Sequence, residues 1–89
     1  MSNQARELIL YSTPACHLCE TAQAVIAPFL GSLNISLQEV DISDSDDLME
    51  KYGIRIPVLR FSGYEQELGW PFSEEEFLAF AALDFVNPD

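Results

Sequence analysis

Two cysteines three positions apart are the residues best suited to chemistry in this chain. Cys16 and Cys19 are its only cysteines, and they enclose His17 and Leu18. Thiol-disulfide exchange requires an attacking thiolate and a second thiol that can resolve the mixed disulfide. A spacing of three in a first helical turn places two thiols side by side. The pair therefore predicts redox chemistry, in which Cys16 attacks and Cys19 resolves.

The residues around the cysteines predict how Cys16 is positioned. Residues 7–11 are short and mostly apolar, which is typical of a buried strand, and residues 12–14 (Ser-Thr-Pro) indicate a turn. Helix-forming residues then run from Cys16 to Leu30. Free N–H groups and the helix dipole favour negative charge at a helix start. We therefore expect Cys16 to be more exposed than Cys19 and to have the lower thiol pKa.

His17 is the only histidine and directly follows the attacking cysteine. Its imidazole could stabilise a thiolate by charge or by a hydrogen bond, and so raise the reduction potential. The alternative is an exposed turn residue whose ring points away from the sulfur. The sequence leaves both interpretations open.

The cysteine pair also allows interpretations without redox turnover. The thiols could be two buried core residues, half of a metal site, or a coincidental pair. A self-contained zinc site is disfavoured, because zinc takes four ligands and the chain offers two cysteines and one histidine. An iron-sulfur cluster would need thiolates from a second chain or from glutathione.

The elements that must position these residues alternate between strands and helices. The apolar face expected for the first helix comprises Leu18, Ala22, Val25, Ile26 and Phe29, with Pro28 predicted to kink or end it near Gly31. We expect a second strand over residues 33–42 and a short helix that is capped within residues 43–47 and closed by Gly53.

The last part of the chain predicts a hairpin and a final helix. We expect strands over residues 54–61, interrupted by Pro57, and over residues 66–68. The final helix begins at Ser73 with a capping box completed by Glu76. Its apolar stripe comprises Phe77, Phe80, Ala81 and Val86. The order β-α-β-α-β-β-α predicts an α/β fold with a mixed sheet flanked by helices.

Length and composition limit the class of protein. The 89 residues suit one domain spanning residues 1–89, with a globular 48% of hydrophobic residues. A net charge of -11 disfavours nucleic acid and anionic membranes and favours basic protein partners, unless it serves solubility alone. No apolar run approaches the roughly 20 residues of a membrane span, and residues 1–7 lack a secretory apolar stretch. We therefore expect a cytoplasmic protein.

The sequence resembles the glutaredoxin-like branch of the thioredoxin-fold proteins. Residues 11–19, Tyr-Ser-Thr-Pro-Ala-Cys-His-Leu-Cys, are similar to the active-site approach of glutaredoxins, and Ile56-Pro57 resembles their cis-proline motif. The resemblance covers nearly the whole chain and is greatest to a little-characterised bacterial glutaredoxin-like group. It implies a four-stranded, three-helix thioredoxin-like fold and a cis Pro57 that faces the cysteines. The Ile56 backbone would then be free to pair with an incoming thiol substrate. An edge-strand proline or bulge is the alternative for Pro57.

The chain departs from glutaredoxins in the region with which they bind glutathione. Their Gly-Gly and acidic pair are replaced by Gly-Trp-Pro-Phe-Ser at residues 69–73. Trp70 and Phe72 could shape the substrate rim. Phe72 is expected instead to anchor the last helix to the core, and Trp70 could do either. Arg55, with Lys51, could hold glutathione carboxylates, or Arg55 could simply balance nearby acids.

Together, the residues and the resemblance predict a monomeric thiol-disulfide oxidoreductase of redox homeostasis. Its substrates would be protein or small-molecule disulfides. It would have no tightly bound cofactor, and glutathione or a thioredoxin-type reductase would supply electrons. A binding module that uses the groove beside Pro57, or a metal or iron-sulfur carrier, are the alternatives.

Overall fold

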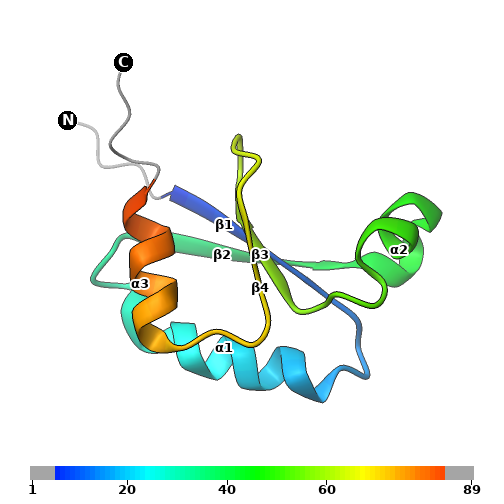
Figure 1. Cartoon of the computed structure of the whole chain (residues 1–89), viewed down its shortest axis with the longest axis horizontal. Coiled ribbons are helices and arrows are strands. Elements are labelled where there is room, and N and C mark those ends of the chain that lie inside the picture. The colour runs from blue at the N-terminus through cyan, green and yellow to red at the C-terminus, as the bar shows by residue number, and fades with distance from the viewer. Residues whose placement is uncertain (1–5, 84–89) are drawn as a thin grey trace.

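One mixed sheet organises the protein (Figure 1). The computed structural model describes residues 6–83, which include strands β1 (Arg6–Ser12), β2 (Ile35–Asp41), β3 (Val58–Phe61) and β4 (Glu67–Gly69). The strand order is β2-β1-β3-β4. β1 is parallel to β2 and antiparallel to β3, and β3 is antiparallel to β4. The predicted four-stranded α/β architecture is confirmed.

The helices cover opposite faces of this sheet. Helices α1 (His17–Leu30) and α3 (Glu74–Leu83) pack on one face, whereas α2 (Asp46–Tyr52) packs on the other face after a short 3-10 turn, η1 (Ile42–Asp44). Apart from η1, the element order is the predicted one. Within residues 6–83 no helix has the length and apolar character needed to cross a bilayer.

The main core lies between the sheet and helices α1 and α3. Alternate residues of a strand point to the same face, so Leu8 and Leu10 of β1 meet Ile26 of α1 and Phe77 of α3, and all four are fully buried. The expectation for Leu18 is wrong, because its side chain is 52% exposed. It lies in the first turn of α1, where no core side chain covers it.

A second, smaller core holds α2 against the other face. The rings of Tyr11 and Tyr52 stack with centroids 4.2 Å apart, and both side chains are buried. The Tyr52 hydroxyl donates to the Glu67 carboxylate at 2.7 Å, and Arg55 forms an ion pair with the same carboxylate. Burial alone would raise the pKa of Glu67, but the hydrogen bonds from Tyr52 and Arg55 outweigh it and lower the pKa. These contacts connect the end of α2 to β4.

The chain between α2 and β3 differs from the expected strand. The prediction of a strand from residue 54 is wrong, because the N–H groups of Arg55 and Ile56 both donate to the Tyr52 carbonyl, at 2.8 and 3.1 Å. These bonds continue the turn at the end of α2, so β3 begins only at Val58. The Ile56-Pro57 peptide is cis, as predicted, and a second cis peptide joins Trp70 to Pro71.

Several helix ends follow the predicted chemistry. Ser73 and Glu76 form the capping box of α3, with reciprocal hydrogen bonds of 2.8 and 3.0 Å. Phe72 is buried in the same core cluster as Phe77, which confirms its expected anchoring role. Helix α1 runs past Pro28 and ends at Leu30, before Gly31. Val86, predicted for the α3 stripe, lies outside the described residues.

The packing predicts the cost of emptying the main core. Phe77→Ala should lower the free energy of unfolding by about 3 kcal/mol or more, because it removes a fully buried ring and leaves a cavity. Leu78→Ala, on the adjacent and 37% exposed position of the same helix, is the control and should cost less than about 1 kcal/mol. Urea unfolding of both variants checks this, and equal losses would contradict the assigned core.

The Glu67 contacts predict a pH-dependent contribution to stability. Because the folded-state pKa of Glu67 lies below its ordinary 4.5, the contribution is present above pH 4.5 and is lost as the pH falls through the folded-state pKa. Glu67→Gln should therefore lower the free energy of unfolding by on the order of 1 kcal/mol at pH 7, and the difference from wild type should vanish in strong acid. Urea unfolding from pH 7 to pH ~2 tests this. Glu65→Gln, at an exposed neighbour, is the control, and a Glu67 effect that persists in acid would contradict the account.

Candidate functional site

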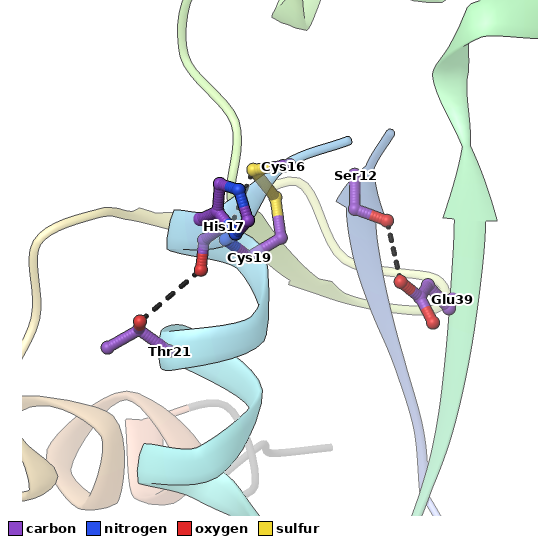
Figure 2. The surroundings of a disulfide bond; sticks show 6 residues. All are labelled: Ser12, Cys16, His17, Cys19, Thr21 and Glu39. Atoms are coloured by element: carbon purple, nitrogen blue, oxygen red, sulfur yellow. Dashed lines mark hydrogen bonds between the residues drawn. A yellow bond between two sulfur atoms is a disulfide. The ribbon is translucent and has the colours of Figure 1, made fainter. Parts of the chain in front are cut away.

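The two cysteines form a disulfide at the N-terminus of α1 (Figure 2). Cys16 is the N-cap residue of the helix, and its Sγ accepts a hydrogen bond from the Cys19 backbone N–H at 3.1 Å. The Cys16 N–H in turn donates to the Thr13 carbonyl at 3.1 Å, which closes the turn between β1 and α1. Cys16 is thus held by both its backbone and its sulfur.

The two cysteine residues differ in their access to solvent. Cys19 is 3% exposed and packs inside the first turn, whereas Cys16 is half-buried and flanked by exposed Ala15 and His17. The predicted difference in exposure is confirmed. An incoming disulfide can therefore reach Cys16 more readily than Cys19.

The helix N-terminus supplies the electrostatics of the site. A side chain at the N-cap accepts from a backbone N–H that would otherwise be unpaired, and the helix dipole favours negative charge there. The Cys19 N–H fills this role for Cys16 Sγ. The same N–H would be available to a Cys16 thiolate once the disulfide is reduced, and the lower thiol pKa expected for Cys16 stays a prediction.

His17 lies in the first turn of α1 with an exposed side chain. Its backbone carbonyl accepts a hydrogen bond from the Thr21 hydroxyl at 3.3 Å (Figure 2). Within residues 6–83 its imidazole forms no hydrogen bond to either sulfur. Its predicted influence on the thiolate stays a prediction.

The proline loop brings together three of the predicted substrate residues. Pro57 is buried, Ile56 is half-buried, and the Trp70 N–H donates to the Pro57 carbonyl at 3.1 Å. The Trp70 ring packs edge-on against Phe72. The expectation of a free Ile56 backbone needs correction, because the Ile56 N–H already donates to Tyr52. Pairing of the Ile56 backbone with a substrate stays a prediction.

Arg55 is directed toward β4. Its guanidinium lies over the Tyr52 ring, 5.2 Å from the centroid, and pairs with Glu67. Lys51 lies over the same ring at 5.2 Å. The structure therefore gives Arg55 an acidic partner within the chain, as the charge-balancing interpretation expects. A role for Arg55 in binding glutathione stays a prediction.

A hollow that the sequence analysis missed lies beside the approach to Cys16. It has a volume of about 250 Å³ and is lined by Ser12, Thr13, Pro14, Glu39 and Asp41. The buried Ser12 hydroxyl donates to Glu39 at 2.9 Å (Figure 2). Hydrogen bonds from the Ser43 hydroxyl and N–H lower the pKa of Asp41. The available signal was that Ser12 and Asp41 fall near the ends of two predicted strands.

A second hollow lies on the side of the molecule that carries α2 and β4, and the described residues form no cluster that could hold a metal ion. A hollow of about 470 Å³ is lined by Lys51, Arg60, Tyr64, Glu65 and Glu67. Within residues 6–83 no three His, Cys, Asp or Glu side chains lie together in a way that could hold a metal ion.

Comparisons with solved structures show proteins of similar fold. A protein XcR50 from X. campestris, solved by X-ray, is 33% identical, with a TM-score of 0.72 over 91% of this chain and 99% of that chain. Protein Ne2328 from Nitrosomonas europaea is 28% identical, with a TM-score of 0.73 over 90% and 98%. The structure of the first two thioredoxin domains of Saccharomyces cerevisiae Eps1p is 26% identical, with a TM-score of 0.52 over 88% of this chain and 34% of that chain. No curated protein matches the sequence significantly.

The family assignment rests on a match along most of the chain. The model of the family described as "Glutaredoxin-like domain (DUF836)" matches residues 7–80, which include both cysteines and the proline loop. The chain has a thioredoxin-like fold and belongs to the glutaredoxin-like domain family.

Proposed function

We propose that the protein is a thiol-disulfide oxidoreductase that works through both thiols of the Cys16-Cys19 pair. The observation that carries the proposal is the position of Cys16, whose sulfur is bonded to Cys19 and accepts the Cys19 N–H at the start of α1. A glutaredoxin-like fold with this spacing of cysteines supports a redox function. The helix start favours the thiolate that such chemistry requires.

The proposed reaction has two exchange steps. The Cys16 thiolate attacks one sulfur of a substrate disulfide, forms a mixed disulfide, and releases the other substrate sulfur as a thiolate that takes up a proton. Cys19 then loses its proton and attacks Cys16 Sγ, which releases the second substrate thiol and forms the Cys16-Cys19 disulfide. Two electrons pass from the protein dithiol to the substrate.

The surrounding residues support docking of a substrate. The Ile56 carbonyl, beside buried Pro57, is the proposed backbone partner of the substrate chain. Trp70, linked to Pro57 by its N–H, would form one wall of the docking groove. We assign His17 a supporting role at the thiolate and Arg55 a role at the groove edge, through its link to Glu67.

An external thiol must restore the dithiol after each turnover. We propose glutathione or a thioredoxin-type reductase for this role, with protein or small-molecule disulfides as substrates, and no tightly bound cofactor. A reducing compartment such as the cytoplasm would keep the pair ready to react. The steps require one copy of the chain, so we propose that a monomer acts.

Two cysteine variants separate the proposed roles. Cys19→Ser should attack a disulfide substrate and stop at a stable mixed disulfide on Cys16, because the resolving thiol is absent. Cys16→Ser should lose at least about 100-fold in exchange rate, because Cys19 is buried and lacks the N-cap position. Mass spectrometry after acid quenching detects the adduct, and circular dichroism of both variants controls for folding. Undiminished exchange by Cys16→Ser would refute the roles.

A further inference from the structure

The hollow beside the approach to Cys16 lies at the ends of two neighbouring parallel strands, from which the chain continues to opposite faces of the sheet. Ser12 ends β1 and Asp41 ends β2, and the two residues are paired in register. After β1 the chain enters α1 on one face of the sheet, and after β2 it enters η1 and α2 on the other face (Figure 1). In open α/β sheets, ligands bind in the crevice at this kind of switch point. We call this space, lined by residues 12–14 with Glu39 and Asp41, the switch-point hollow.

The residues that line the switch-point hollow suit a side chain with an apolar stem and a positively charged end. The Glu39 carboxylate accepts from Ser12, and the Asp41 carboxylate accepts from Ser43, so both partners are uncharged. The one ion pair within residues 6–83 joins Arg55 to Glu67, which leaves both hollow carboxylates without a basic partner. Pro14 adds an apolar wall. Lys and Arg combine an apolar stem with a charged end, and they match this lining.

The hollow is also one turn away from the proposed attacking sulfur. The hydrogen bond from the Cys16 N–H to the Thr13 carbonyl closes a turn, so the Cα atoms of these residues lie within roughly 7 Å. An extended substrate chain advances about 3.3 Å per residue. A substrate whose cysteine meets Cys16 therefore presents a residue about two positions away to the hollow.

We propose that the switch-point hollow binds the Lys or Arg side chain of a protein substrate, about two positions from the cysteine that Cys16 attacks. The inference rests on the proposed oxidoreductase function and specifies its substrates as disulfides flanked by basic residues. The net charge of -11 would further attract a basic substrate protein.

Two disulfide-linked peptide dimers test the inference on the reduced full-length chain. Each peptide has one cysteine, and the residues one and two positions away on both sides are Lys in one peptide and Gln in the other. The readout is the rate of Cys16-Cys19 disulfide formation, measured by quenched mass spectrometry in low salt. The ratio of the Lys-peptide rate to the Gln-peptide rate is then divided by the same ratio for reduction of the two peptides by dithiothreitol. The corrected ratio excludes any difference in intrinsic reactivity between the two peptide disulfides.

Matched double variants then test whether the preference for the Lys peptide comes from the carboxylates of the switch-point hollow. Glu39→Gln with Asp41→Asn removes both charges of the hollow but keeps the acceptor oxygens for Ser12 and Ser43. The control is Glu7→Gln with Glu65→Gln, which removes the same amount of charge away from the hollow. Glu7 lies near the start of β1, at the end of the strand opposite to the hollow. Glu65 lies in the connection between β3 and β4, which is near the same end because Phe61 pairs with Leu8. The Gln-peptide rate of each variant serves as its own reference for folding.

The outcomes distinguish the inference from the function on which it rests. We expect a corrected ratio of about fivefold or more in wild type and in the Glu7/Glu65 variant, and a ratio near one in the Glu39/Asp41 variant. Equal rates for both peptides in wild type, or equal losses in both variants, would overturn the inference and leave the oxidoreductase function standing. If neither peptide oxidised the pair, both proposals would fail.

Discussion

The hydrogen bond from the Cys19 N–H to Cys16 Sγ is the interaction on which the site depends. It makes a sulfur atom the N-cap of α1, so the helix start and the candidate reactive atom are the same structural feature. The geometry follows from the strand before it, because β1 is buried in the centre of the sheet and ends one short turn before Cys16. The core under β1 thereby fixes the position of the sulfur.

Packing on both faces of the sheet builds the surroundings of this sulfur. Helices α1 and α3 share the larger core, whereas α2 is held by the stacked rings of Tyr11 and Tyr52 and by Glu67. The bonds from Arg55 and Ile56 to Tyr52 continue that support into the loop before Pro57. Because the chain continues from β1 and from β2 to helices on opposite faces of the sheet, the switch-point hollow lies beside the turn that holds Cys16. The small acidic chain thus places a redox pair, a proline loop and a carboxylate-lined hollow around one end of β1.

The sequence predicted those features whose chemistry is local. The spacing of Cys16 and Cys19, the capping box at Ser73, and the apolar periodicity of the helices depend on neighbours a few residues away, and they placed the elements in the right order. The Ile56-Pro57 motif also led correctly to a cis peptide, through the family resemblance.

The remaining features depend on local bonds that no sequence pattern signals or on contacts between distant residues, and the sequence did not predict them. The turn at residues 53–57 replaces the expected strand because two amides bond to the Tyr52 carbonyl, and the same bond occupies the Ile56 N–H. Arg55 meets Glu67, and Ser12 meets Glu39, only after the strand register is set. Leu18 fits the helical period but lies beyond the cover of the core.

A redox titration of the Cys16-Cys19 pair in glutathione buffers, followed by mass after thiol trapping, tests the central claim most directly. The account predicts a reversible intramolecular disulfide with a midpoint potential between about -180 and -270 mV, the range of dithiol oxidoreductases. A pair that stays reduced at every poise, or that forms a disulfide that cannot be reduced again, would contradict it.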